Sequence, residues 1–223
     1  MSDLRLVIFD VDGTLVDSQG DIVGSMSRAF AALGKPAPAR ENVLSIVGLS
    51  LDVAMQRLAP EASLGEQIDL VDAYKQAYQD LRAAKGSVES SPLYPGARQI
   101  LDALRAQPYT LLGVATGKSR RGLDSLIAGH ALEGFFVTEQ VADHHPSKPH
   151  PSMIEAAMAE TGVDAAQTVM IGDTSFDMSM ARAAGVRGIG VSWGYHGREK
   201  LADAEIIIDR FEELLPVLDQ MLG

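Results

Sequence analysis

The sequence predicts an α/β protein with a mostly parallel sheet, helices on both faces of that sheet, and one inserted block made only of helices. Two observations carry this prediction. Short apolar runs alternate with longer helical stretches along most of the chain, which is the pattern of right-handed βαβ crossovers. Between residues 17 and 93 the alternation stops, and only helical periodicity remains. In such a sheet, ligands bind beyond the carboxyl ends of the strands.

The expected strands are the short apolar runs that lie between the helical stretches. Runs of this kind fit strands that are covered on both faces, because a buried parallel strand has no polar side. Along the chain they are residues 4–9, 110–115, 135–138, 168–171, 186–191 and 205–208.

The helical block at residues 17–93 is expected to be a cap domain, with residues 1–16 and 94–223 forming the catalytic core. Its apolar residues recur at spacings of three and four, which is typical of helices with one buried face. Both exits, residues 17–20 and 90–96, are rich in turn residues and suit a hinge. Because both ends emerge beside the first strand, we expect the block to cover the ligand site. The alternative is a separate helical domain with no gating role. The periodic residues are Ile22, Met26, Ala29, Phe30 and Leu33, then Ile68, Val71, Tyr74, Tyr78 and Leu81.

Composition limits the possible partners. The 223 residues carry a formal net charge of -11, which argues against nucleic acid and anionic membranes because phosphate backbones are bound by clustered Lys and Arg. A small phosphorylated substrate needs only a local positive patch and stays possible. The absence of cysteine excludes disulfides and thiolate catalysis. No run approaches membrane-spanning length and the start lacks signal-peptide features, so we expect a cytoplasmic protein.

The first candidate site follows the strand at residues 4–9, where Asp10, Asp12 and Gly13 come in close succession. Residues two apart on a strand project to the same side, so both carboxylates are expected to lie close together, while Gly13 permits a sharp turn. Two neighbouring anions need a cation, and Mg²⁺ commonly bridges protein carboxylates to a substrate phosphate. The alternative is an ordinary turn, in which Asp and Gly are common.

A second apolar strand ends in the same way, with Gly172 and Asp173, and Asp177 follows four residues later. If the two strands lie side by side, Asp173 comes within reach of a metal held by Asp10. Asp177 is then a further ligand or an acceptor that supports the ligands. The alternatives are a helix N-cap for Asp173 and a solvated helix position for Asp177.

Two further segments offer groups that bind phosphate. Thr116 and Gly117 end the strand at residues 110–115, where a hydroxyl, a backbone amide and a helix amino end suit phosphate oxygens. The segment is not a P-loop, because its glycine spacing is wrong. Lys148, between prolines, could hold both a nucleophilic carboxylate and a transferring phosphoryl group. The alternatives are an N-cap for Thr116 and a solvated surface charge for Lys148.

Taken in order, these four motifs resemble those of the haloacid dehalogenase-like hydrolase superfamily, over nearly the whole chain. The helical insertion after the first motif is similar to the small-cap subgroup that holds phosphoglycolate phosphatases and β-phosphoglucomutases. The resemblance implies a Rossmann-like core. It also implies that the enzyme is a phosphatase that requires Mg²⁺.

The resemblance also implies a role for each motif residue. Asp10 is the nucleophile that forms an aspartyl-phosphate, and Asp12 is first the acid for the leaving oxygen and then the base for water. The metal ligands are Asp10, the Asp12 backbone carbonyl and Asp173, supported by Asp177. The phosphoryl oxygens are bound by Thr116, Gly117 and Lys148.

Departures from related subgroups narrow the expected activity. Dehalogenating members lack the second aspartate of the first motif, whereas Asp12 is present. Residues 47–51 offer no lysine for a Schiff base, and Leu51 stands where phosphoglucomutases carry a phosphate-binding arginine. We therefore expect hydrolysis of a small phosphorylated metabolite, with phosphoglycolate as the leading substrate. The alternatives are a phosphoryl-transferring mutase and a phosphate-binding module without turnover. Oligomeric state and the cap residues that set specificity are not predicted.

Overall fold

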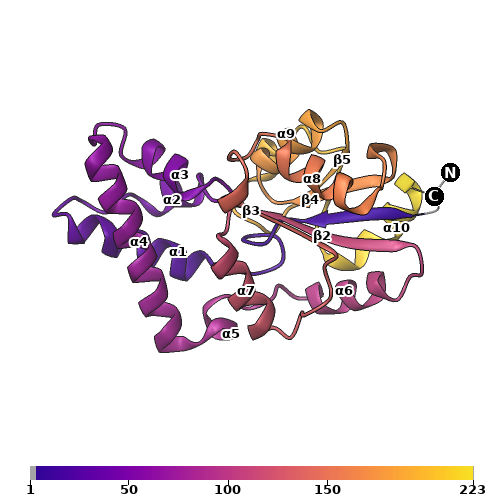
Figure 1. Cartoon of the computed structure of the whole chain (residues 1–223), viewed down its shortest axis with the longest axis horizontal. Helices are drawn as coiled ribbons and strands as arrows, with labels where there is room; N and C mark the ends of the chain where they lie inside the picture. The colour runs from indigo at the N-terminus through magenta and orange to yellow at the C-terminus, as the bar shows by residue number, and fades with distance from the viewer. Residues whose placement is uncertain (1–3, 223) are drawn as a thin grey trace.

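The computed structural model describes residues 4–222. Its centre is a six-stranded sheet in the order β3-β2-β1-β4-β5-β6, in which every neighbouring pair is parallel. This confirms the predicted fold class, and Figure 1 shows helices on both sides of the sheet. The strands are β1 (Arg5–Phe9), β2 (Thr110–Thr116), β3 (Thr138–Val141), β4 (Thr168–Gly172), β5 (Arg187–Val191) and β6 (Ile206–Ile208).

The two faces of the sheet have separate cores, because successive side chains of a strand point to opposite faces. On β1, Val7 and Phe9 pack into one core and Leu6 and Ile8 into the other. The first core includes α6 (Ala97–Arg105), α7 (Arg120–Gly129) and α10 (Leu214–Leu222). The second includes α8 (Ser152–Thr161) and α9 (Ser175–Ala183). Four 3₁₀ turns are described as well: Ala142–His144, Ala165–Gln167, Arg198–Lys200 and Phe211–Glu213.

The third strand begins later than predicted. The sequence favours residues 135–138, but β3 is Thr138–Val141. Phe135 and Phe136 are buried in the core as part of the loop that leads into the strand. The apolar run at these positions therefore indicates a buried loop and not a strand. The strand itself lies at the edge of the sheet and contains the polar residues Glu139 and Gln140, which weaken an apolar signal.

Among the described residues, the block at 17–93 contains helices and no strand longer than an isolated bridge. Its core joins Ile22, Met26 and Phe30 with Met55 and Leu70. The longest helix, α4, begins with a capping box between Ser63 and Glu66 and packs along α1. The helices are α1 (Gln19–Ala32), α2 (Arg40–Leu44), α3 (Leu51–Leu58), α4 (Leu64–Lys85) and α5 (Ser87–Ser90).

The two segments that connect this block to the sheet lie side by side. Val16 and Leu93 form an isolated antiparallel bridge, the Asp17 amide donates to the Pro92 carbonyl at 2.9 Å, and the Tyr94 amide donates to the Leu15 carbonyl at 2.9 Å. The domain boundaries at residues 16/17 and 93/94 stay a prediction. In Figure 1 the helical block lies beyond the carboxyl ends of the strands, where ligands are expected. Within residues 4–222, no helix combines the length and apolarity needed to cross a membrane.

Candidate active site

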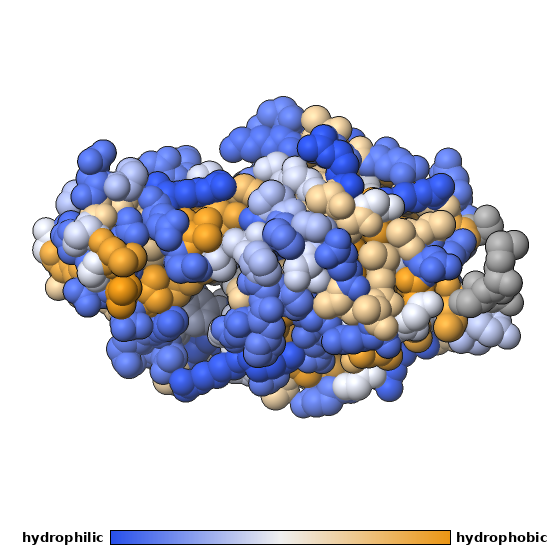
Figure 2. Space-filling model, turned by 45° about the horizontal axis from the view of Figure 1, so that its top comes forward, coloured by the Kyte–Doolittle hydropathy of each residue, from blue (hydrophilic) through white to orange (hydrophobic). Residues whose placement is uncertain are grey.

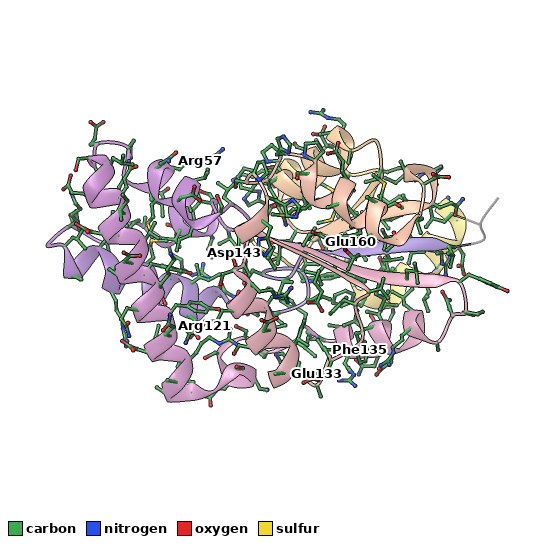
Figure 3. All side chains as sticks on the ribbon, in the orientation of Figure 1. Arg57, Arg121, Glu133, Phe135, Asp143 and Glu160 are labelled. Atoms are coloured by element: carbon green, nitrogen blue, oxygen red, sulfur yellow. The ribbon has the colours of Figure 1, made fainter. Side chains whose placement is uncertain are left out.

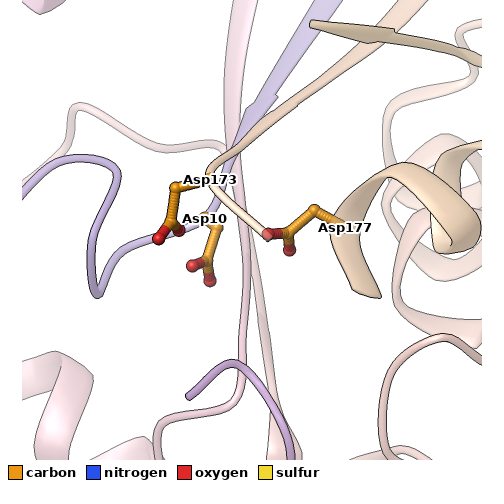
Figure 4. A group of neighbouring side chains, drawn as sticks. All are labelled: Asp10, Asp173 and Asp177. Carbon is orange, nitrogen blue, oxygen red and sulfur yellow. The ribbon is translucent and has the colours of Figure 1, made fainter. Parts of the chain in front are cut away.

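Three carboxylates, those of Asp10, Asp173 and Asp177, meet where β1 and β4 end (Figure 4). The two strands are neighbours, and the Asp10 amide donates to the Ile171 carbonyl at 2.9 Å. One oxygen atom of each carboxylate lies within 4.8 Å of the others, and all three residues are buried. The juxtaposition of Asp10, Asp173 and Asp177 expected from their motifs is therefore present in the structure.

Among the described residues, one buried cation contacts this group of carboxylates. The Lys148 ammonium donates to Asp10 Oδ1 at 2.8 Å and to Asp177 Oδ1 at 2.7 Å, and its side chain is fully buried. Three buried carboxylates beside one ammonium leave excess negative charge, which is costly in a protein interior. Asp10 Oδ2 is also buried without a hydrogen-bond partner. A hard divalent cation with oxygen ligands, such as Mg²⁺, fits both observations.

The carboxylate of Asp173 is oriented by neutral donors. The Thr14 hydroxyl donates to Oδ1 at 3.1 Å, and the Tyr195 amide donates to Oδ2 at 2.8 Å. Gly13 lies so close that a Cβ there would be 2.2 Å from Asp173 Oδ2, and its φ is +87°. Glycine is therefore required at this turn for backbone conformation and for the space around the Asp173 carboxylate.

Gly13→Ala is expected to weaken Mg²⁺ binding by about 10- to 100-fold, because it displaces the Asp173 carboxylate. Gly34→Ala is the matched control: φ is +68° there, but an added Cβ would meet no atom within 4 Å. It should reduce stability while leaving Mg²⁺ affinity unchanged. Calorimetric titration with Mg²⁺ measures both variants, and equal losses of affinity would contradict this account.

Asp177 belongs to the first turn of α9, where it is part of a second capping box. Its Oδ2 accepts from the Thr174 amide at 3.0 Å and from the Thr174 hydroxyl at 2.7 Å, while Oδ1 accepts from Lys148. Thr174, not Asp173, is the N-cap residue. Asp177 is fully buried, so it is not a solvated helix residue. The capping box at the start of α9 thus holds the Asp177 carboxylate in position to accept a hydrogen bond from Lys148.

Asp12 lies near Asp10 but has a cation of its own. The Lys118 ammonium is 2.8 Å from Asp12 Oδ1, and the Ser18 hydroxyl donates to the same oxygen. The Asp12 carboxylate is not part of the group formed by Asp10, Asp173 and Asp177. A role for Asp12 in metal binding rests on its backbone carbonyl and stays a prediction.

Lys118 is a charged residue of this site that the sequence analysis did not assign. It is buried, and its pKa is raised because the favourable charge of Asp12 outweighs the burial that opposes it. The signal was its position directly after Thr116 and Gly117, at the end of a strand whose edge was already expected to bind phosphate.

Thr116 is the last residue of β2 and is fully buried, and its hydroxyl accepts from the Lys118 amide at 3.2 Å. It is not a helix N-cap, because Ser119 caps α7 by accepting from the Gly122 amide. Gly117 faces the cap: a Cβ there would lie 2.7 Å from the carbonyl oxygen of Gly48. The turn at Thr116 and Gly117 and the cap loop at Gly48 therefore touch.

A cavity of about 640 Å³ lies between the cap and the sheet edge. Asp10, Asp12, Thr116 and Gly117 line its core side. Its cap side is formed by residues of α1, of α4 and of the segment at 46–54. The predicted catalytic and phosphate-binding residues therefore share one cavity, apart from Lys148, which lies behind Asp10. Arg121 and Asp143, which also line the cavity from the core, are labelled in Figure 3.

Burial raises the pKa of Asp10 to about 7, with neighbouring Asp177 and Asp12 adding to the increase and Lys148 opposing it. Burial, with the charges of Asp177 and Asp10, also raises the pKa of Asp173 well above its ordinary value. A folded-state pKa above the ordinary 3.8 means that the protonated Asp10 fits the fold better than the ionised one. Without metal, the protein should therefore lose stability as pH rises from about 4 to about 7.

Mg²⁺ is expected to raise the melting temperature more at pH 8 than at pH 5.5, because it favours the ionised carboxylates. Each kcal/mol added to the free energy of unfolding raises the melting temperature by about 2–4 °C in a chain of this size. Thermal unfolding in Mg²⁺ and in EDTA across this pH range measures the difference. In Asp10→Asn the difference between the two pH values should be smaller. If Mg²⁺ changes the melting temperature of the unaltered chain equally at both pH values, the raised pKa of Asp10 would be contradicted.

The sequence comparison agrees with the motifs and the fold. A sequence profile of the family described as haloacid dehalogenase-like hydrolase matches residues 7–191. The chain therefore belongs to the haloacid dehalogenase-like hydrolase family, which confirms the resemblance seen in its four motifs.

Individual relatives match the chain over nearly its whole length. It is 36% identical to a probable phosphatase, IndB, of Dickeya dadantii, over 97% of this chain and 94% of that protein. It is 30% identical to a phosphoglycolate phosphatase of Vibrio parahaemolyticus, over 97% of this chain and 96% of that protein. Among solved structures, a predicted phosphoglycolate phosphatase from Haemophilus somnus has a TM-score of 0.84 at 25% identity, with 97% and 99% covered. A β-phosphoglucomutase from Clostridium difficile, 17% identical, has the same fold with a TM-score of 0.81 and 97% and 98% covered.

Proposed function

We propose that this chain is a Mg²⁺-dependent phosphatase that hydrolyses a small phosphorylated metabolite through an aspartyl-phosphate on Asp10. The observation that carries the proposal is the buried Asp10 carboxylate on the wall of the cavity. Lys148 holds its Oδ1 at 2.8 Å, while Oδ2 has no hydrogen-bond partner. Because a carboxylate has two oxygens, one of them can bind a metal ion while the other attacks phosphorus.

The reaction has two steps, with the roles that the family resemblance gives. In the first, an Asp10 oxygen bonds to phosphorus, the bond to the leaving oxygen breaks, and Asp12 donates a proton to that oxygen. In the second, Asp12 takes a proton from water as the water oxygen attacks phosphorus. The bond between phosphorus and the Asp10 oxygen breaks, which releases phosphate and restores the Asp10 carboxylate. Asp12 lines the same cavity as Asp10, as both transfers require.

The chain supplies groups for the charge that builds up on the phosphoryl oxygens. Thr116, the Gly117 amide and the Lys148 ammonium are the proposed partners of these oxygens. Asp10, Asp173 and the Asp12 backbone carbonyl would hold Mg²⁺, with Asp177 in support, and the bound ion would offset the charge of the phosphoryl group. Lys148 keeps Asp10 in place through its second contact, with Asp177.

Phosphoglycolate is the leading substrate, and the names of the relatives support this choice. The mutase alternative has less support. Leu51 lines the cavity where the resemblance would place a phosphate-binding arginine. The likeness to a β-phosphoglucomutase structure at 17% identity is one of fold. A phosphate-binding module without turnover is opposed by the presence of both Asp10 and Asp12.

Release of phosphate from a panel of phosphorylated acids, sugars and nucleotides, with Mg²⁺ or with EDTA, tests the proposal. We expect stoichiometric phosphate and free alcohol with Mg²⁺, and no turnover in EDTA. Formation of a phosphorylated isomer without phosphate release would favour the mutase. If the chain releases phosphate from no compound of the panel in Mg²⁺, the result would favour a phosphate-binding module without turnover.

A further inference from the structure

Arg82, on the cap helix α4, is a cation that the proposed chemistry does not use. It lines the cavity between cap and core, together with Tyr78 and Tyr74 of the same helix. All three of its guanidinium nitrogens, Nε, Nη1 and Nη2, are buried and have no hydrogen-bond partner. Within residues 4–222, Arg82 forms no ion pair, so no carboxylate oxygen lies within 4.0 Å of these nitrogens. Buried charges without partners are costly and therefore rare.

The contact that Arg82 does make is with an aromatic ring that it shares with the active site. Its guanidinium carbon lies 5.7 Å from the centroid of the Tyr78 ring, and the Lys118 ammonium lies 5.5 Å from the same centroid. The Tyr78 hydroxyl accepts from Lys118 at 3.3 Å, and Lys118 pairs with Asp12. A contact of this kind is weak beside a charge-assisted hydrogen bond, so it leaves the guanidinium's five donors unsatisfied.

Two cations, Lys118 of the core and Arg82 of the cap, line one cavity and lie beside one tyrosine ring. Lys118 is beside Asp12, which the proposed mechanism assigns to the leaving oxygen. Arg82 lies beside the same Tyr78 ring but belongs to the cap helix α4. Cap residues are the ones expected to set specificity for the leaving part of the substrate. At about 640 Å³, the cavity has room for a leaving group of several carbons beyond the phosphoryl group. A planar guanidinium is also the group best suited to bind a carboxylate or phosphate with two parallel hydrogen bonds.

We propose that Arg82 binds a second anionic group, a carboxylate or a second phosphate, on the part of the substrate that leaves as the alcohol. The inference rests on the proposed phosphatase function and narrows its substrate class to doubly anionic metabolites. Arg82 acts on specificity only, because the reacting phosphorus is held by other residues. Binding would supply the partners that its nitrogens lack.

A purely structural role for Arg82 makes a different prediction. Asp21 of α1 is buried and its Oδ2 also lacks a hydrogen-bond partner, while Lys85 lies 3.4 Å from Oδ1. If Arg82 serves only to balance the charge of Asp21, its removal should lower stability and affect every substrate equally. If it binds substrate, its removal should affect only substrates with a second anion.

Matched pairs of phosphate esters separate the two roles. In three pairs a carboxylate replaces a neutral group: 2-phosphoglycolate and ethyl phosphate, 3-phosphoglycerate and glycerol 3-phosphate, 6-phosphogluconate and sorbitol 6-phosphate. In a fourth pair, fructose 1,6-bisphosphate and fructose 6-phosphate, the difference is a second phosphate. The value of kcat/KM is measured for each ester with Mg²⁺. The proteins are the unaltered chain, Arg82→Met, Arg82→Lys and the control Arg28→Met, whose arginine is exposed on α1.

We expect the unaltered chain and Arg28→Met to prefer the doubly anionic member of at least one pair by about 10- to 100-fold, the range for hydrogen bonds to a charged group. Arg82→Met should reduce that ratio to near one and leave the neutral member almost unchanged. Arg82→Lys keeps the charge but loses the two parallel donors of the guanidinium, so its kcat/KM ratio should lie between those of the unaltered chain and Arg82→Met. The pair that shows the preference identifies the anion as carboxylate or phosphate.

Two outcomes would overturn the inference: no pair is discriminated by the unaltered chain, or the discrimination survives in Arg82→Met. The same pairs are titrated calorimetrically against Asp10→Asn with and without Arg82→Met, so binding is measured where turnover is absent. If the unaltered chain releases no phosphate, the phosphatase proposal fails, and the titration still decides the role of Arg82. Melting temperatures show whether each variant is folded.

Discussion

Asp10→Asn is expected to lower the rate of phosphate release by about 10⁴-fold or more, the size of loss seen when a nucleophile is removed. An amide cannot form the bond to phosphorus, and it also removes the charge that Lys148 holds in place. The fold should survive, because Lys148 keeps Asp177 as a partner and a neutral side chain at residue 10 relieves a costly burial of charge. In EDTA at pH 8 the variant should be at least as stable as the unaltered chain.

The control is Asp72→Asn on the surface of α4, where the side chain is 72% exposed. It should keep full activity. Asp10→Ala is a second variant that cannot revert by deamidation, and it should be equally inactive. Circular dichroism and melting temperature establish that each variant is folded. Activity within tenfold of normal in a folded Asp10→Ala would remove this residue as the nucleophile.

Lys148→Met is expected to lower the free energy of unfolding by about 3–5 kcal/mol in metal-free buffer at pH 8, and to abolish measurable turnover. The reason is that Asp10 and Asp177 lose the one ammonium that they share. Denaturant unfolding measures the loss. It should shrink at pH 5.5, because Asp10, with a pKa of about 7, is then protonated and needs no cation.

Lys75→Met provides the comparison, since Lys75 forms an exposed ion pair: its side chain is 57% exposed and lies 3.9 Å from Asp72 of the same helix, α4. Its cost should be below about 1 kcal/mol, as for exposed ion pairs. Adding Asp177→Asn to Lys148→Met should cost less than the sum of the two single changes, because both act on one contact. Additive losses would show that Lys148 and Asp177 are not coupled in the way that their 2.7 Å contact indicates.

Sequence patterns located the parts of the site that are local. Asp10 and Asp173 each follow a short buried strand, so the parallel arrangement of those strands is enough to bring them together. The third strand was placed too early, because Phe135 and Phe136 are buried in a loop and hydrophobicity alone does not separate a loop from a strand. On α4, Ile68 belongs to the periodic set but is 53% exposed.

The remaining contacts depend on positions far apart in the chain, which no local pattern encodes. Lys148 pairs with Asp10 across 138 residues, and Lys118 meets Tyr78 of the cap across 40. A lysine is usually solvated, so Lys118 carried no signal by itself. Arg82 likewise looks like an ordinary surface residue of a helix in the sequence, although the nitrogens of its guanidinium are buried in the structure.

We propose that the phosphoryl group passes through Asp10, and trapping the phosphorylated intermediate tests this most directly. Asp12→Asn is mixed with acetyl phosphate and Mg²⁺ and quenched with acid within milliseconds. Acetate is a good leaving group and needs no proton from residue 12, while the second step lacks its base, so the intermediate should accumulate. Peptide mass spectrometry should find one phosphoryl group, on Asp10. Phosphorylation at another residue, or phosphate release with no phosphorylated protein at any time, would contradict the account.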